Sequence, residues 1–307
     1  IEGLGTTAIW FTPSFKNQPV QGEGANASAG YHGYWITDFT RVDPHFGTNA
    51  EMKAFVDAAH ARGIKVYLDI ITNHTADVIK YRECPENRCA YRNRADYPYT
   101  RQGGVDGQPI NEGFDGRDFS RLQRPDWAYT PYIPAGEENA KVPAWLNDPI
   151  RYHNRGESTF AGESSLDGDF AGLDDLLTED PVVVQGMIDI FGGWIEKYGI
   201  DGFRIDHPDG LADPAGYLAR LTQECRRGTP IWVEKILEGE ERLPADWACA
   251  GTTGYDALRV QRVQAGGDET VIWVANGVPT PIRILQRDAD GVLGTLGTLL
   301  ALPFVLW

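Results

Sequence analysis

Short apolar runs alternate with amphipathic segments in the first part of the chain, and this order predicts strands and helices in turn. Residues 6–11 (TTAIWF) are an apolar run that ends at Thr12-Pro13, which is typical of a buried strand. Residues 65–71 (KVYLDII) form a second such run. Between them, a helix that starts at Thr48-Asn49 and stops at Gly63 is indicated by apolar residues at helical spacing, namely Met52, Phe55, Val56 and Ala59.

The same alternation returns after residue 182. A helix that ends at Gly199 has one apolar face, formed by Val183, Met187, Ile190, Phe191 and Trp194. Residues 200–206 read as the next strand. Asp213 and Pro214 begin a further helix that stops before Gly228, and residues 230–234 follow as a strand. Strands that alternate with helices predict a parallel sheet, which places the chain in the α/β class.

Residues 76–172 interrupt this pattern. They are rich in Tyr, Arg, Asn, Asp and Gly and lack long periodicity, and a stretch of this length is not a simple connection. We expect a small inserted domain over the strand ends. Its aromatic residues either offer stacking surfaces or form the core of the insert: Tyr97, Tyr99, Trp127, Tyr129, Trp145 and Tyr152.

Composition narrows the classes of ligand. The 44 acidic and 28 basic residues give a formal charge of -16, which disfavours nucleic acid and anionic membranes and favours a neutral ligand. No segment reaches the length of a membrane span. The spacing of Cys84 and Cys89 allows a local disulfide or two free thiols, and no cysteine or histidine spacing predicts zinc. The chain begins at Ile1 without a leader, so we expect any signal peptide to be removed or absent.

Two carboxylates carry the candidate chemistry. Asp206 and Glu234 each close an apolar run, and reactive groups of parallel sheets gather where strands end. A retaining glycosidase needs one ionised and one protonated carboxyl about 5 Å apart. These two residues are therefore candidate catalytic groups.

Four separated motifs and a short fifth one point to a family. They are Gly33-Tyr34-Trp35, residues 69–74 (DIITNH), residues 202–206 (GFRID), Val233-Glu234 and residues 173–176 (LDDL). In this order they resemble the alpha-amylase superfamily, glycoside hydrolase family 13. The resemblance implies a (β/α)8 barrel of the TIM type with an inserted domain after the third strand. Residues 1–75 and 173–257 would belong to the barrel, 76–172 would be the inserted domain B, and 258–307 stay unassigned.

The resemblance also implies roles for single residues. Asp206 would be the nucleophile and Glu234 the acid. Arg204, on the same strand face as Asp206, would keep that carboxylate ionised. Burial of Glu234 away from Arg204, with the charge of Asp206, would raise its pKa. His74 would hydrogen-bond sugar hydroxyls, and Tyr34 would stack under that ring.

The resemblance also implies a structural role for Asp69 and a calcium site. Asp69 matches a position that the family uses to hold the strand end and its loop. Amylases often bind calcium between the barrel and the inserted domain, and Asn73 and Asp175 match two ligand positions. Gly210 stands where the family has a histidine, although its backbone carbonyl remains as a ligand.

The sequence departs from the family pattern in its second half. The third family carboxylate, an Asp after His, has no counterpart because no histidine follows His207. The chain opens on what resembles the second barrel strand, and later strands have only weak candidates at 252–255 and 271–275. These features predict an incomplete barrel from a fragment or a fusion, with exposed sheet edges.

The resemblance leaves three functions open. Residues 1–206 resemble amylases and alpha-glucosidases, whereas about 204–256 is similar to maltooligosyltrehalose synthase. The first hypothesis is a retaining hydrolase of alpha-1,4-glucans, and the second is intramolecular transglucosylation. The third is an inactive relative that binds glucan through its aromatic residues. Localisation stays open as well, since amylases are commonly secreted and trehalose-forming relatives act inside the cell.

Overall fold

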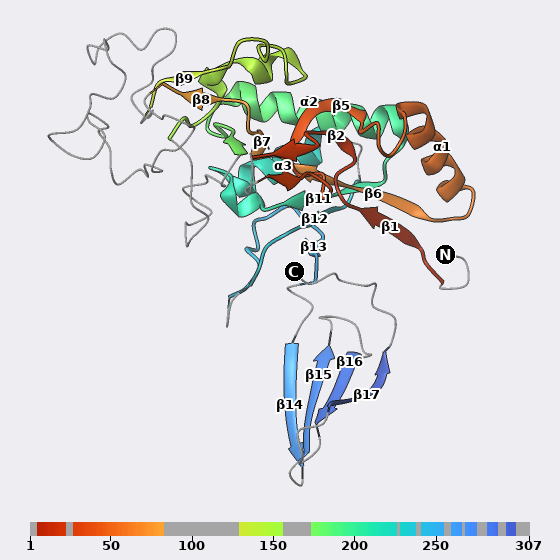
Figure 1. Ribbon diagram of the computed structural model, residues 1–307. Helices are drawn as coiled ribbons and strands as arrows, with labels where there is room; N and C mark the ends of the chain where they lie inside the picture. Colours follow the sequence, from red (N-terminus) through yellow and green to blue (C-terminus); the bar gives the residue numbers. More distant parts are fainter. Residues whose placement is uncertain are drawn as a thin grey trace, which may run out of the picture.

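A five-stranded parallel sheet forms the centre of the protein. The computed structural model describes residues 5–22, 27–82, 129–155, 173–225, 228–237 and 241–254, and the backbone of four later strands. The sheet has the order β1 (Ala8–Phe11), β6 (Lys65–Ile71), β11 (Gly202–Asp206), β12 (Ile231–Val233) and β13 (Gly251–Thr252) (Figure 1). All neighbouring pairs are parallel. The prediction of a parallel α/β sheet is confirmed, including the weak candidate around residue 252.

The sheet is open among the described strands. β1 and β13 lie at its two edges, and each pairs with one neighbour within this sheet. The described residues therefore form five parallel strands of the predicted barrel type, and these strands do not close into a barrel.

The three described α-helices begin at local capping signals, and α1 ends at His60, three residues before the predicted stop at Gly63. α1 (Asn49–His60) starts with a capping box in which Thr48 and Glu51 bind each other's backbone amides. α2 (Pro181–Tyr198) ends at Gly199, which has a φ of 79°. α3 (Pro214–Glu224) is capped by Asp213, whose side chain accepts from the amide of Gly216. Local chemistry thus sets the helix ends.

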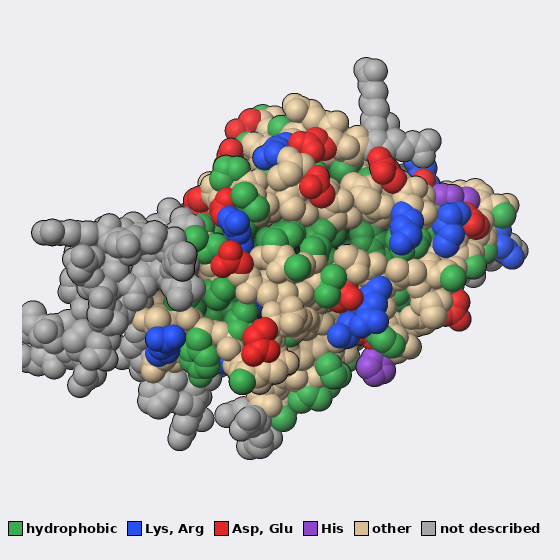
Figure 2. Space-filling model, turned by 90° about the horizontal axis from the view of Figure 1, so that it is seen from above, with side chains coloured by type: hydrophobic (Ala, Val, Ile, Leu, Met, Phe, Trp, Pro, Cys, Tyr) green, Lys and Arg blue, Asp and Glu red, His purple; other side chains and the backbone are tan. Residues whose placement is uncertain are grey.

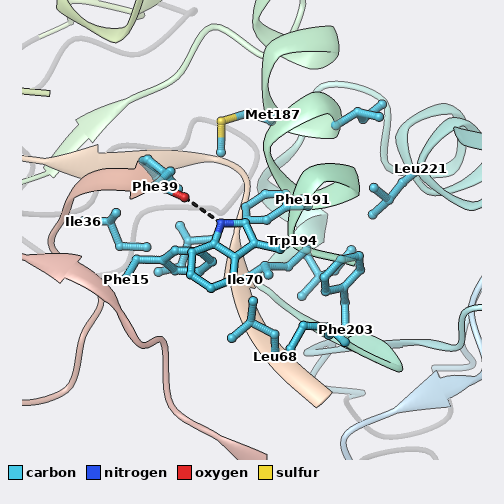
Figure 3. Close-up of a cluster of buried hydrophobic side chains, with 14 of the residues drawn as sticks. Phe15, Ile36, Phe39, Leu68, Ile70, Met187, Phe191, Trp194, Phe203 and Leu221 are labelled. Atoms are coloured by element: carbon cyan, nitrogen blue, oxygen red, sulfur yellow. Dashed lines mark hydrogen bonds between the residues drawn. The ribbon is translucent and has the colours of Figure 1, made fainter. Parts of the chain in front are cut away.

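One face of the sheet is covered by the helices and forms the core. Leu68 and Ile70 of β6 and Phe203 of β11 are fully buried against α2 side chains (Figure 3). The indole Nε1 of Trp194 donates a 2.7 Å hydrogen bond to the carbonyl oxygen of Phe39. Because neighbouring residues of a strand point to opposite faces, the polar residues of β6 and β11 lie on the other face.

Short elements surround this sheet. β2 (Phe15–Asn17) pairs with β5 (Ile36–Val42), β3 (Val20–Gln21) with β4 (Ser28–Ala29), β7 (His74–Ala76) with β10 (Leu173–Asp175), and β8 (Lys80–Tyr81) with β9 (Pro131–Tyr132). The described residues also form three 3-10 helices: η5 (Ala144–Asn147), η6 (Pro149–Arg151) and η7 (Pro208–Gly210).

Four later strands form a sheet of their own. β14 (Arg259–Ala265), β15 (Asp268–Val274), β16 (Pro281–Arg287) and β17 (Leu293–Thr298) pair in chain order, and all their pairs are antiparallel. The expectation of a barrel strand at 271–275 is wrong, because residues 271–274 belong to β15. Connections of a few residues can join antiparallel strands, whereas a parallel crossover needs a dozen residues or more.

The described part of the insert packs its aromatic residues inward. Tyr129 and Tyr152 are buried, so they form a core and do not offer stacking surfaces. Trp145 is half-buried and lies against Gly186 of α2, where a Cβ atom would come within 2.5 Å of the indole ring. Tyr97, Tyr99, Trp127, Cys84 and Cys89 lie outside the described residues. A separate domain B stays a prediction.

The surface carries both signs of charge. Figure 2 shows acidic and basic side chains interspersed over the face in view. Among the described helices, none combines the length and the apolarity needed to cross a bilayer.

Candidate active site

Strand register brings the candidate residues onto one face of the sheet. Arg204 lies opposite Asp69 of β6 and opposite Trp232 of β12. Asp206 is the last residue of β11, two residues after Arg204, and therefore points to the same face. Glu234 follows directly after β12, and its amide donates to the carbonyl oxygen of Ile205. The ends of β11 and β12 thus present the two carboxyl groups side by side.

Arg204 connects three carboxyl groups. Its Nη1 atom lies 2.9 Å from Oδ1 of Asp69 and 2.7 Å from Oδ1 of Asp206. Its Nη2 atom lies 2.9 Å from Oε2 of Glu234. Because both candidate catalytic carboxyls bind one guanidinium group, they lie close together on the same side of the sheet.

The environment of Glu234 differs from the expectation in one respect. The prediction that it lies away from Arg204 is wrong, since the two side chains form an ion pair. Burial still raises the pKa of Glu234 to about 7, and the charge of Asp206 adds to the effect while Arg204 opposes it.

Asp69 lies beneath Arg204 and is fully buried. It accepts hydrogen bonds from Nε1 of Trp10 at 3.2 Å and from the hydroxyl of Tyr34 at 3.4 Å. The guanidinium carbon of Arg204 lies 5.5 Å from the Trp10 ring centre, within the range of a cation–π contact. Trp10 is a site residue that the sequence analysis missed, and its place in the apolar run of β1 carried no signal of this contact.

Tyr34 and His74 meet at the edge of this cluster. The Tyr34 hydroxyl accepts from Nη1 of Arg204 at 3.3 Å, and Nε2 of His74 lies 3.2 Å from the Tyr34 carbonyl oxygen. His74 is 3% exposed, and burial lowers its pKa to about 3, so its ring is neutral at pH 7. Its Nδ1 atom lies 3.0 Å from Oδ1 of Asn73.

Asn73 and Asp175, the predicted calcium ligands, come together through the β7–β10 pair. Asp175 lies opposite His74, and the amide of Leu176 donates to the carbonyl oxygen of Asn73. Among the described residues, no group of three or more His, Cys, Asp or Glu could hold a metal ion. Calcium takes six to eight oxygen ligands, and these side chains supply two. The calcium site therefore stays a prediction.

Comparison with known proteins identifies the family. A family model described as "Alpha amylase, catalytic domain" matches residues 1–226. An alpha-amylase from Streptomyces lividans is 56% identical over 209 residues, which make up 67% of this chain and 22% of that protein. The chain belongs to the alpha-amylase family. This membership makes it a relative of glycoside hydrolase family 13 enzymes.

Solved structures of alpha-amylase family proteins agree with this assignment. Maltooligosyltrehalose synthase from Arthrobacter ramosus gives a TM-score of 0.51 at 27% identity and covers 84% of this chain and 34% of that chain. An alpha-amylase from Geobacillus thermoleovorans, complexed with acarbose, gives 0.51 at 26% identity, with 83% and 43% covered. The chain thus spans between 22% and 43% of the length of these three relatives.

His207, which directly follows the candidate nucleophile Asp206, is a second site residue that the sequence analysis missed. The amide of His207 lies 3.3 Å from Oε2 of Glu234, and His207 has a φ of 43°. The available signal was its position next to Asp206.

Proposed function

We propose that this chain carries the nucleophile and the acid of a retaining glycoside hydrolase that acts on alpha-1,4-glucans. The observation that supports it is the pairing of Asp206 and Glu234 on one guanidinium group, with the pKa of Glu234 raised to about 7. At neutral pH one carboxyl can then be ionised while the other holds a proton, as this chemistry requires.

The reaction would proceed in two steps. Asp206 attacks the anomeric carbon while Glu234 gives its proton to the departing glycosidic oxygen, which forms a covalent glycosyl-enzyme. Glu234 then takes a proton from water, and the resulting hydroxide releases the sugar from Asp206. Arg204 holds both carboxyls in place. Tyr34 would stack under the reacting ring, and His74, whose Nε2 lies 3.2 Å from the Tyr34 carbonyl oxygen, would hydrogen-bond hydroxyls of that sugar.

The test is release of reducing sugar from maltooligosaccharides. Asp206→Asn and Glu234→Gln should each lower the rate by about 10²-fold or more, as loss of a positioned catalytic group does. Asp57→Asn removes an acid in an exposed pair with Lys53 and serves as the matched control with an unchanged rate. Equal rates in all four proteins would refute the assignment.

Similarity to maltooligosyltrehalose synthase favours a second candidate function. This reaction transfers the glycosyl group to a hydroxyl of the same molecule, so reducing ends disappear. Asp206 and Glu234 would keep the same roles. Reducing ends that fall with time, while the sugar is consumed, would support this function over hydrolysis.

A third candidate is glucan binding without turnover, because residues 1–307 contain no match to the motif of the third family carboxylate. A positioned stabiliser of the transition state contributes about 10²-fold or more to the rate. Acarbose, the ligand of the Geobacillus thermoleovorans structure, is a suitable probe. Calorimetric binding of acarbose together with unchanged maltooligosaccharides after long incubation would support this candidate.

Calcium binding at Asn73 and Asp175 is a separate proposal. Among the described residues, Oδ1 of Asn154 is buried without a hydrogen-bond partner, and the amide of the preceding His153 binds the Asp175 carbonyl oxygen. A hard cation would take such oxygen atoms as ligands. A melting temperature that falls in a chelator and returns with calcium, but not in Asp175→Asn, would support the proposal. An identical melting temperature with and without chelator would refute it.

A further inference from the structure

His207 has a backbone conformation that few residues with a side chain adopt. Its φ and ψ are 43° and 54°, in the left-handed region that favours glycine. This conformation directs its amide at Oε2 of Glu234, 3.3 Å away. Because His207 directly follows Asp206, its amide connects the backbone next to Asp206 with the side chain of Glu234. Something must hold His207 in this disfavoured conformation.

Asp209 contacts the residue that follows each catalytic candidate. Its Oδ1 atom lies 3.2 Å from Nδ1 of His207, and its Oδ2 atom lies 3.5 Å from Nζ of Lys235. Lys235 directly follows Glu234 and also binds Glu241 at 2.8 Å. The side chains of Asp209 and Lys235 are 22% and 16% exposed, so solvent screens this contact less than it screens an ordinary surface pair.

The local backbone prepares Asp209 for this contact. It lies in η7 (Pro208–Gly210), and the amide of Gly210 donates to the carbonyl oxygen of His207 at 3.1 Å. The ring of Pro208 restricts the chain between His207 and Asp209. This short turn returns the Asp209 carboxylate toward the end of β12.

We propose that Asp209 is a positioning residue that joins the end of β11 to the end of β12 through His207 and Lys235. It would set the separation of Asp206 and Glu234 and keep the His207 amide on Glu234. The predicted effect of Asp209 on catalysis rests on the proposed function, whereas its predicted effect on the structure does not. The contact of the His207 amide is a structural consequence that can be measured without any substrate.

Hydrogen exchange of the His207 amide tests the structural part. Asp209→Asn and Lys235→Met should each speed this exchange by about tenfold or more, because the amide loses its hold on Glu234. Lys235→Arg retains the bridge and should restore the slow exchange. Glu241→Gln removes only the other partner of Lys235 and is the matched control. An unchanged exchange rate of the His207 amide in Asp209→Asn would overturn the proposal. Exchange that becomes equally faster at the strand amides of Ile205 and Val233 would also overturn it, because the substitution would then have destabilised the whole sheet.

Kinetics on maltooligosaccharides test the catalytic part. Asp209→Asn should lower kcat about tenfold with KM within about twofold, since the pair would be misplaced while the remaining substrate contacts persist. Lys235→Arg should retain wild-type kcat. Wild-type kcat in Asp209→Asn, despite faster exchange at His207, would overturn the proposal. If the wild-type chain turns over no glucan, the proposed function fails, and the exchange result alone decides whether Asp209 holds His207.

Discussion

Arg204 contacts Glu234 directly, with 2.9 Å between Nη2 of Arg204 and Oε2 of Glu234. The same guanidinium group binds Asp69 and Asp206, so one cation faces three acidic groups. Burial and the charge of Asp206 therefore raise the pKa of Glu234 to about 7 even though a cation touches it. The three carboxyl groups carry more negative charge than Arg204 balances, and binding of a proton near neutral pH reduces this excess.

The raised pKa of Glu234 predicts a pH-dependent stability. Between its ordinary value of 4.5 and about 7, the folded protein binds more protons at Glu234 than the unfolded chain does. The free energy of unfolding should therefore fall as pH rises through this window. Glu234→Gln should remove that part of the slope, while Asp69, whose pKa is also raised by burial, retains its own part. Urea unfolding at pH 4.5, 6 and 8 measures the difference, and a pH-independent difference between the two proteins would contradict the prediction.

The same pKa predicts the alkaline side of the activity profile. Glu234 acts as an acid only while protonated, so kcat/KM for maltooligosaccharides should decline above about pH 7. Initial rates between pH 5 and 9 measure the profile. A plateau that extends unchanged to pH 9 would show that deprotonation of Glu234 does not limit the reaction.

Loss of Arg204 should destabilise the protein through Asp69. Arg204→Met leaves a fully buried carboxylate without its cation, which typically costs about 3–5 kcal/mol. The double variant Arg204→Met/Asp69→Asn should recover a large part of this loss, because the remaining amide carries no charge. Denaturant unfolding of both variants gives the values, and additive losses from the two substitutions would argue against this coupling.

The buried pair of Lys141 and Asp174 predicts a contrast with a surface pair. The two side chains are 1% and 3% exposed and form an ion pair, and Asp174 also accepts the amides of Val78 and Ile79. Lys141→Met should cost about 3–5 kcal/mol, because it leaves the buried carboxylate unpaired. Lys53→Met breaks an exposed pair and should cost less than about 1 kcal/mol. Thermal and urea unfolding of the two variants compare these costs, and similar losses would be inconsistent with burial as the cause.

Gly193 within α2 and Gly199 directly after it should respond in opposite directions to alanine. Gly199→Ala places a side chain at a φ of 79°, which should cost about 1–2 kcal/mol although space is available. Gly193→Ala changes an exposed position of α2 with nothing within 4 Å of the new Cβ, and should stabilise by about 0.5–1 kcal/mol. Melting temperatures of the two variants decide the signs. Stabilisation by both would contradict the assignment of Gly199 as the left-handed helix end.

The elements themselves could be predicted because their signals are local. The apolar spacing after Thr48 indicates α1, and residues 65–71 indicate β6 with the same bounds as in the structure. The antiparallel sheet of β14–β17 was missed, although the Gly-Gly pair at 266–267 is a sequence signal typical of a two-residue hairpin turn. A short apolar run has the same sequence pattern in a parallel and in an antiparallel sheet, so the neighbouring strands determine which kind of sheet it joins.

The sequence by itself determined the family, the order of helices and strands, and the two carboxylates that end their strands, because these depend on nearby residues and on motifs in order. Only the tertiary structure decided that Arg204 touches Glu234, that Trp10 and Tyr34 bind Asp69, and that His207 turns its amide toward Glu234. Those contacts depend on the register of β1, β6, β11 and β12. Strand register brings together residues such as Trp10 and Asp69, 59 positions apart, and Asp69 and Arg204, 135 positions apart, and no local pattern in the chain encodes these separations.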